Sequence, residues 1–295
     1  MSTVNSTGDV RIHSDAVGRV PSIGWRLSDL WRAPLTDLPV RDELIRQYVP
    51  LSPLMDVMEV GPGSGFPAFR MAREVGTLTL LEVAAGSAAM LRKRFEGTPN
   101  VGVVIDDLCR EGLGRRHACS ADAIIAIDVL MFVPDPATAL GNMAKMLRPR
   151  ATLFMAVPNY EIPDWPTFYR TRAELETHLH AAGFAEWEIY SLRLSPWSQL
   201  LYNWLHEAPL GLYRALQTAR RKRPPRALTY DETWAIQHGR GMEALKLPIH
   251  LYWAAVMILM RLGGDLFRRA ECGEEIFRKN LFVVAHRGGS DGGIE

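Results

Sequence analysis

Residues 55–65 read Met-Asp-Val-Met-Glu-Val-Gly-Pro-Gly-Ser-Gly, an apolar run that ends in three glycines at alternate positions. The apolar part has the composition of a buried strand, and residues 67–75 have the pattern of a helix that follows it. Glycines between a strand and a helix let the backbone turn sharply and let a ligand approach without Cβ atoms in the way. The stretch therefore predicts a strand, a ligand-binding loop and a helix.

The chemistry of this loop differs from that of phosphate-binding loops. Gly65 is followed by Phe66, whereas a P-loop needs Gly-Lys-Ser/Thr, and the third glycine comes one residue earlier than in the NAD fingerprint G-x-G-x-x-G. A carboxylate at Glu59 would repel a pyrophosphate but attract an ammonium group. The loop favours a nucleoside ligand with a cationic amino-acid end, and the alternative is a tight turn beside an incidental acid.

Strand-like and helix-like segments alternate after the loop, which predicts βαβ units in a parallel sheet. Right-handed crossovers would bring the carboxyl ends of the strands to one edge, where ligands bind. A helix is also expected before the first strand, at 41–49. Further strands are predicted at 77–83, 101–105, 121–127, 152–157, 187–192 and 280–285, and helices at 84–95, 136–147 and 171–182.

Acidic residues follow the second and third predicted strands. Glu82 lies 21 residues after Gly61, where a carboxylate can accept hydrogen bonds from both hydroxyls of a ribose. Asp106 and Asp107 form a pair at the end of the third strand. These acids would lie at the same sheet edge as the glycine loop.

Residues 55–160 resemble a class I S-adenosylmethionine (SAM)-dependent methyltransferase, in the style of the small-molecule and quinone-type branch. The resemblance covers about half of the chain. It implies SAM as the cofactor and a seven-stranded, mostly parallel, Rossmann-like sheet. The matching stretches are VMEVGPGSG, LTLLEV, NVGVVIDDL, ADAIIAIDVLMFVPDPATAL, MLRPRATLFMAVPN, RAELETHLHAAGF and NLFVVAHR.

The resemblance also implies a role for each cofactor residue. Gly61 and Gly63 would pass the methionyl moiety of SAM, and Glu59 would help to hold its ammonium group. The residues Asp128, Val129 and Leu130 would lie beside the methionyl and sulfonium region, and the alternative for Asp128 is an N-cap or loop carboxylate. The full set implied is Glu59, Gly61, Pro62, Gly63, Gly65, Glu82, Val83, Asp106, Asp107, Leu108, Asp128, Val129 and Leu130.

At the nucleoside end of the cofactor, Glu82 would bind the ribose hydroxyls and Val83 would pack on adenine. Asp107, in preference to Asp106, would accept from the adenine amino group. The other acid of the pair would be a solvated strand end or a helix cap.

The chain departs from the family before the fifth strand. The family often has a Pro-Gly-Gly turn there, and this chain has Arg148-Pro-Arg-Ala151. Because that turn lies away from the cofactor edge, we expect the change to affect the geometry of the turn more than activity.

About 85 residues without a strand signal precede the last strand, and they predict a helical insertion. Residues 190–281 hold 14 basic and 8 acidic side chains, a net charge of +6, against −5 for the remainder. The basic run 220–226 is either a solvated loop or a contact for anionic lipid. The apolar run 248–260 is too short to span a bilayer comfortably. It is either a buried helix, on the sheet or in a dimer interface, or a helix that lies at the membrane interface or lines the acceptor site.

No residue stands in a diagnostic motif for a catalytic base. Tyr160 follows the fifth strand and should lie on the ligand edge, and His238 lies in the insertion beside Gly239. They are the two candidates, and the alternative is that each is an ordinary surface or core residue.

Composition excludes several other classes of protein. The 295 residues have a net charge of +1 and 47% hydrophobic residues, which excludes a mainly disordered chain and a generally basic nucleic-acid binder. Three scattered cysteines are too few for a disulfide framework or a zinc site, so we expect no metal and a reducing compartment. The first 20 residues show no secretory signal, which predicts a cytoplasmic protein. Peripheral membrane association is predicted from the basic and apolar runs of the insertion.

These observations predict a SAM-dependent methyltransferase that acts on a lipophilic small molecule, such as a quinone precursor, lipid, polyketide or terpenoid. The partners expected are this acceptor and an anionic membrane surface, and no nucleic acid. The alternatives are methylation coupled to cyclisation, SAM used only as a cationic helper, and a membrane-docked binding protein without catalysis. The predicted domains are a tail at 1–20, a SAM-binding domain at 21–195, a helical acceptor cap at 196–278, the last core strand at 279–288 and a tail at 289–295.

Overall fold

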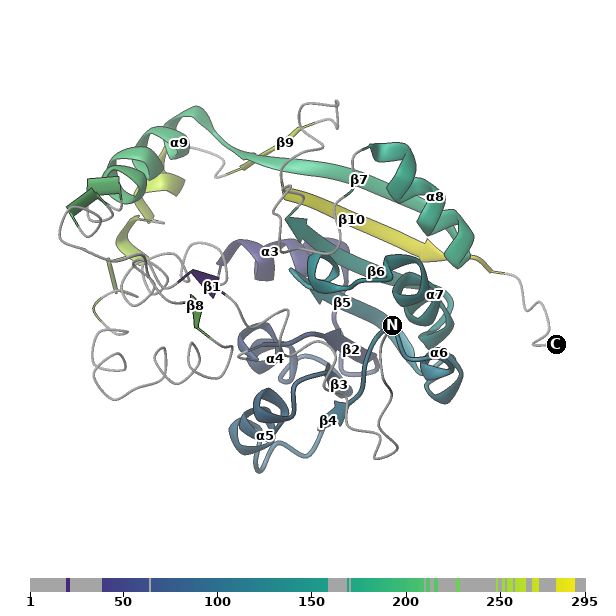
Figure 1. Ribbon diagram of the computed structural model, residues 1–295. Helices are drawn as coiled ribbons and strands as arrows, with labels where there is room; N and C mark the ends of the chain where they lie inside the picture. Colours follow the sequence, from purple (N-terminus) through teal and green to yellow (C-terminus); the bar gives the residue numbers. More distant parts are fainter. Residues whose placement is uncertain are drawn as a thin grey trace. The chain divides into compact units, whose positions relative to one another are not determined.

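The computed structural model of the chain divides into two units, residues 41–192 with 269–295, and residues 1–40 with 193–268 (Figure 1). The described residues are 20–21, 39–63, 65–158, 169, 171–209, 211–212, 215–216, 227–228, 248, 251–252, 254–256, 258–263, 267–270 and 280–289.

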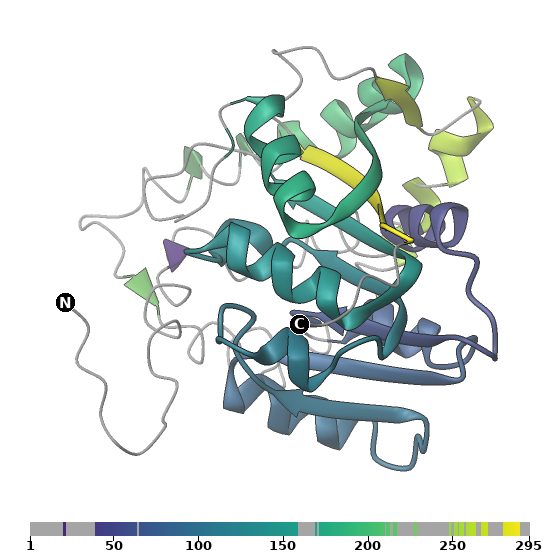
Figure 2. The ribbon, with the colours of Figure 1, turned by 90° about the vertical axis from the view of Figure 1, so that its right-hand side faces the viewer.

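The larger unit is built on a twisted sheet whose strands run in the order β4-β3-β2-β5-β6-β10-β7-β9 (Figure 1). The pairs from β4 to β6 are parallel, and β10 is antiparallel to both β6 and β7. Figure 2 shows β10, in yellow, among these strands. The strands are β2 (Asp56–Val60), β3 (Thr77–Glu82), β4 (Val101–Ile105), β5 (Ala121–Ile127), β6 (Leu147–Pro158), β7 (Phe184–Leu194), β9 (Phe267–Ala270) and β10 (Asn280–Arg287). The predicted α/β fold with a mostly parallel, seven-stranded, Rossmann-like sheet is confirmed, and the short β9 adds an eighth strand.

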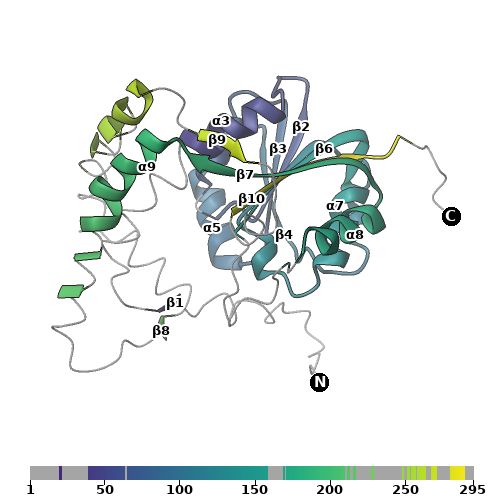
Figure 3. The same ribbon diagram turned by 90° about the horizontal axis from the view of Figure 1, so that it is seen from above.

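Helices cover both faces of this sheet. Figure 3 shows α7 and α8 on one face and α3 and α5 on the other. Asp135 caps the start of α7 by accepting from the Thr138 N–H, and Gly183 ends α8 at a φ of 95°. The helices are α3 (Pro39–Tyr48), α4 (Phe66–Met71), α5 (Ala85–Arg94), α6 (Leu113–Arg116), α7 (Pro136–Met146) and α8 (Arg172–Ala182), with a 3₁₀ turn, η1, at Leu130–Phe132.

The expectation of an insertion without strands is wrong at two places. The strand β8 (Ala227–Leu228) pairs antiparallel with β1 (Val20–Pro21), and β9 is the eighth strand of the large sheet. Strands of two to four residues are too short to give an alternating pattern in sequence, so the sequence carried no signal for them. The predicted tail at 1–20 lies outside the described residues except for its last residue.

Two helical segments of the smaller unit lie side by side. The helix α9 (Pro196–Tyr202) continues into a π-helical turn, η2 (Asn203–Glu207), and described residues between 251 and 262 are helical. The Trp197 indole N–H donates to the Leu259 carbonyl at 3.1 Å, and the Tyr252 hydroxyl donates to the Leu205 carbonyl at 2.8 Å. These two contacts make the segments an antiparallel pair, called the helical pair below. No helix among the described residues is long and apolar enough to cross a bilayer.

Candidate functional site

The loop between β2 and α4 follows a path that only glycine adopts easily. Gly61, Gly63 and Gly65 have φ angles of 60°, 53° and 72°, in the left-handed region that side chains disfavour. A Cβ atom at Gly61 would lie 2.5 Å from Cγ2 of Val129. At Gly63 a Cβ atom would meet no described atom within 4 Å. The loop is therefore closed against the β5 side at Gly61 and open at Gly63, where a ligand could approach.

Glu59 places a buried carboxyl group just before this loop. Its side chain is 3% exposed, and its Oε2 atom has no hydrogen-bond partner in the described part of the chain. Burial raises the pKa of this carboxyl group to about 8. A buried carboxylate without a partner is costly, and a ligand ammonium would supply the missing charge and hydrogen bond. The residues present therefore fit the aminoacyl end of SAM.

Glu82 ends β3, next to the glycine loop. Its Oε1 atom accepts from the Ala84 N–H at 2.9 Å. Burial raises the pKa of the carboxyl group, and hydrogen bonds from the backbone of Ala84, Val83 and Gly63 oppose this rise. The Gly61 N–H in turn donates to the Leu81 carbonyl at 2.9 Å. Residues from two strand ends that the sequence assigned to one cofactor thus lie in contact with each other.

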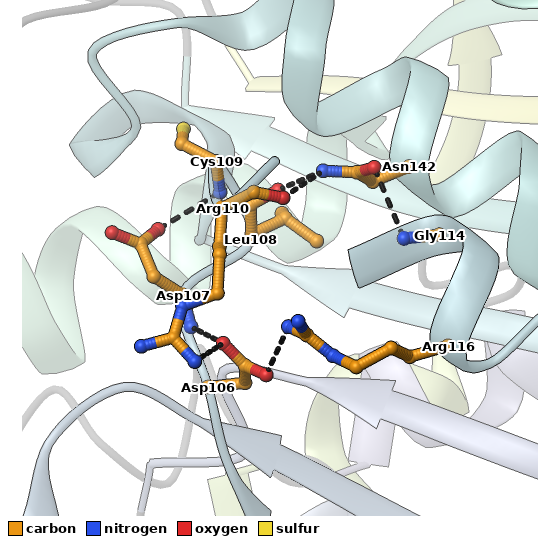
Figure 4. A network of polar contacts seen from close by, with 8 residues as sticks. All are labelled: Asp106, Asp107, Leu108, Cys109, Arg110, Gly114, Arg116 and Asn142. Carbon is orange, nitrogen blue, oxygen red and sulfur yellow. Dashed lines mark hydrogen bonds and ion pairs between the residues drawn. The ribbon is translucent and has the colours of Figure 1, made fainter. Parts of the chain in front are cut away.

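Asp106 and Asp107, which are adjacent in sequence, have different surroundings (Figure 4). Asp106 pairs with Arg116 at 2.7 Å and with Arg110 at 3.3 Å, and it accepts from the Asp107 N–H at 2.8 Å. Asp107 accepts from the Cys109 N–H at 2.8 Å through Oδ1, and in the described chain its second oxygen accepts no such bond. Asp106 is therefore occupied in holding the loop, which favours Asp107 as the acceptor for an adenine amino group.

The third group of predicted residues follows β5. Asp128 has a φ of 55°, and its N–H donates to the Ala156 carbonyl at 2.9 Å. A positive φ is uncommon at residues other than glycine, and such residues are enriched at functional sites. The N-cap position of η1 is Val129, so Asp128 does not cap that turn. Val129, through its contact with the Gly61 position, brings the end of β5 to the glycine loop.

Of the remaining predicted residues, four lie in the described part of the chain and two lie outside it. Pro62, within the loop, and Leu108 and Leu130 are buried, and Val83 is half-buried. The two candidates for a catalytic base, Tyr160 and His238, lie outside the described residues, and their roles stay predictions.

Sequence reasoning missed Asn142. Its side chain is 6% exposed and contacts the loop that carries Asp107 (Figure 4). It lies on the buried face of α7 with Ala139 and Met146. A lone amide among apolar positions at helical spacing was the signal that could have indicated it, since buried amides need hydrogen-bond partners.

Comparisons with known proteins agree with this geometry. Residues 58–155 match the family model described as a methyltransferase domain. The chain is 30% identical over 138 residues to a ubiquinone biosynthesis O-methyltransferase of Paracidovorax citrulli (strain AAC00-1), covering 46% of this chain and 56% of that one. It is 29% identical over 182 residues to the enzyme of the same name from Hahella chejuensis (strain KCTC 2396), covering 61% of this chain and 72% of that one.

Among solved structures, a Galdieria sulphuraria protein assigned as a sarcosine dimethylglycine methyltransferase superposes with a TM-score of 0.51. It is 11% identical and covers 85% of this chain and 86% of that one. At this identity the likeness concerns the fold alone. The chain spans little more than half the length of the first of the curated relatives above.

Proposed function

We propose that this chain, whose residues 58–155 form a class I SAM-dependent methyltransferase domain, transfers the methyl group of SAM to a lipophilic small molecule. The observation that carries the proposal is the buried, unpartnered oxygen of Glu59 beside a loop that is open at Gly63. A carboxylate that lacks only a cation, next to backbone that a ligand can approach, suits the aminoacyl end of SAM. The domain match supports the family and the cofactor that the sequence predicts.

When bound, SAM supplies an electrophilic methyl group on a sulfonium centre, so the protein has mainly to bind, orient and exclude water. Glu59 would pair with the ammonium group of the ligand. Glu82 would accept from the ribose hydroxyls, and Asp107 from the adenine amino group. These three acids lie at or just after the carboxyl ends of β2, β3 and β4, which are neighbours in the sheet, so they could hold the ligand along its edge.

The acceptor that we propose is a lipophilic molecule with a nucleophilic oxygen, such as a phenolic quinone precursor. The curated relatives are named as O-methyltransferases of ubiquinone biosynthesis, which supports an oxygen acceptor. Lipid, polyketide and terpenoid acceptors have the same apolar character. A phenol of this kind would lose its proton to a base, for which Tyr160 and His238 are the candidates.

We also propose that the chain associates with an anionic membrane surface. Large apolar side chains are exposed in and near the helical pair, among them Trp204 at 69% and Leu262 at 77%. The basic run 220–226 adds positive charge to the same stretch of sequence. Exposed apolar side chains and basic residues together are typical of proteins that bind at the surface of an anionic bilayer.

Calorimetric titration of the full chain with SAM tests the cofactor part of this proposal. We expect binding by the wild type and none by Gly63→Arg, since the new side chain would extend into the open side of the loop. No binding by the folded wild type, or equal binding by the variant, would refute the proposal.

Incubation with radiolabelled SAM and a lipid-soluble extract, followed by mass spectrometry, tests the acceptor. A labelled apolar product with one added methyl group is the expected result. A cyclised product without added mass would favour SAM as a cationic helper, and SAM affinity without turnover on any extract would favour a binding protein. For membrane association, sedimentation with anionic and neutral vesicles is the test, and equal sedimentation with both would contradict the role of the basic run.

A further inference from the structure

The Asn142 side chain forms hydrogen bonds with backbone groups of the loop after β4 and of the start of α6. Its Nδ2 atom donates to the carbonyls of Leu108 at 2.8 Å and Arg110 at 3.1 Å, and its Oδ1 atom accepts from the Gly114 N–H at 3.1 Å (Figure 4). One buried amide on α7 thus fixes the loop after β4 and the first turn of α6. Replacing it by an apolar side chain would remove the hydrogen bonds to the Leu108 carbonyl and the Gly114 N–H, whereas the Arg110 carbonyl would keep the one from the Leu113 N–H.

The approach of α6 to α7 depends on the glycine at the same contact. A Cβ atom at Gly114 would lie 3.0 Å from both the Oδ1 and the backbone oxygen of Asn142, and 2.9 Å from Cβ of Lys145. The two helices therefore lie as close as backbone permits. This close approach sets the position of the arginine that α6 carries.

That arginine, Arg116, holds the other end of the loop. It reaches from α6 to Oδ2 of Asp106 at 2.7 Å, and Asp106 accepts from the Asp107 N–H at 2.8 Å through its other oxygen. The loop is thus held at its start by the ion pair of Asp106, and two residues later by the hydrogen bond from Asn142 to the Leu108 carbonyl. Asp107 is the residue between these two points of attachment.

We infer that Asn142 and the Asp106–Arg116 ion pair are positioning residues for the base of the cofactor. They hold the loop so that the Asp107 carboxylate meets the adenine 6-amino group, and they touch no part of the ligand themselves. The inference rests on the proposed function, because it assigns a role within the same SAM site. Its physical basis is preorganisation, since a carboxylate that is already in place loses little conformational entropy when the ligand binds.

Two ligands measure this role directly. The first is S-adenosylhomocysteine, and the second is its analogue with hydrogen in place of the purine 6-amino group. Their ratio of dissociation constants in calorimetry reports the hydrogen bond to the amino group alone. We expect the wild type to prefer the amino compound by at least about tenfold, as for a hydrogen bond to a charged acceptor.

Asn142→Leu should reduce this preference to about threefold or less, because the three hydrogen bonds from the Asn142 side chain are lost. Arg116→Met should reduce it as well, and since the Arg116 side chain is 47% exposed, this variant keeps the core intact. The matched control is Asn100→Leu, because Asn100 also donates to two carbonyls, those of Ala72 at 2.8 Å and Val75 at 3.1 Å, in a turn away from the loop. The control should lose stability and keep the full preference for the amino compound.

The possible results separate the two proposals. No binding of S-adenosylhomocysteine by the wild type would overturn both the proposed function and this inference. Binding with equal affinity for the two ligands, or an unchanged preference in Arg116→Met and in every folded Asn142 variant, would overturn this inference alone. A reduced preference in Asn100→Leu would also overturn it, because the effect would then follow general stability.

Discussion

The sheet unit and the helical pair differ in what they bury and what they expose. In the sheet unit, Glu59, Glu82 and Asp106 lie buried at or near strand ends, and Asn142 lies buried on α7. In the smaller unit, large apolar side chains are the exposed feature. Those at residues 193–268 in the described part of the chain are Trp197, Leu200, Trp204, Leu212, Leu216, Leu251, Ile258, Leu259 and Leu262.

This difference indicates two kinds of function. Buried polar groups are costly, so a site that keeps them fits one ligand with complementary groups. Exposed apolar groups bind favourably to any apolar partner that covers them, since the hydrophobic effect is not directional. A selective cofactor site and a tolerant apolar surface are both features that the proposed transfer to a lipophilic acceptor would need.

Gly61→Ala should have the largest effect on ligand binding and should leave the apolar surface unchanged. The φ of 60° and the 2.5 Å approach to Val129 force the loop to move, which we expect to weaken SAM binding about a hundredfold. The free energy of unfolding should fall by about 1–3 kcal/mol. Calorimetry and thermal denaturation measure the two effects. Gly141→Ala, at a helical glycine with open space around it, is the control, and equal losses in both variants would refute the explanation.

Glu59→Gln should stabilise the fold in a pH-dependent way. Burial raises the pKa of Glu59 from 4.5 to about 8, so the folded protein keeps a proton that the unfolded chain loses. The free energy of unfolding of the wild type should therefore fall as pH rises from 4.5 to about 8, and the variant should escape this loss, by up to about 5 kcal/mol. Denaturant titrations at pH 5 and 8.5 test this, with the exposed Glu96→Gln as control. A constant difference between Glu59→Gln and wild type would contradict the assignment.

The same carboxyl group should make SAM binding depend on pH. The ligand ammonium favours the ionised form of Glu59, so binding below pH 8 must release the proton that burial retains. Wild-type affinity should rise from pH 6 to 8, and calorimetry in buffers of different ionisation enthalpy should detect the released proton. Proton release that persists in Glu59→Gln would assign the effect to another group.

Trp204→Ser should have a moderate effect confined to the apolar surface. Losing one exposed indole should reduce binding to anionic vesicles about tenfold, with SAM affinity unchanged and stability altered by less than about 1 kcal/mol. Vesicle sedimentation measures membrane binding, and calorimetry measures SAM affinity. The control is Leu54→Ser, which removes a side chain that is 92% exposed in the sheet unit. A similar loss of vesicle binding in both variants would remove the distinction between the two regions.

Arg150→Gly should have the smallest effect and leave both functions unchanged. Arg150 has a φ of 64° near the start of β6, where the pairing with β5 is irregular and where the family often has glycine. Glycine relieves this backbone strain, so the free energy of unfolding should rise by about 0.5–1 kcal/mol. Denaturant titration measures the gain, and Arg150→Ala, which keeps a Cβ atom, should show none. An equal gain in both would assign the effect to the arginine side chain.

Much of the sheet could be predicted because its elements have strong local patterns. The strands at 101–105 and 121–127 have the predicted bounds, since continuous apolar runs and flanking turns mark them clearly. The start of β6 at Leu147, five residues earlier than predicted, could not be read from the sequence. Its early residues Arg148 and Arg150 are polar, and Arg148 is held there by Asp56 and Asp122 from neighbouring strands.

For the site, spacing predicted which residues lie close together, but not which of the two adjacent aspartates is free of ion pairs in the described part of the chain. Asp106 and Asp107 are identical in type and adjacent, and only the arginines of the loop and of α6 distinguish them. Asn142 had no local motif, because its partners lie 28 to 34 residues away in the chain.

The sequence by itself determined the glycine loop, the alternating elements and the acids at the strand ends, because each depends on neighbours within a few residues. The tertiary structure alone decided that Oε2 of Glu59 is buried without a hydrogen-bond partner in the described part of the chain, and that Asp106 is paired. It also decided that Asn142 fixes the loop of Asp107. Burial and pairing depend on groups that the fold brings together from distant parts of the chain, and local pattern carries no record of them.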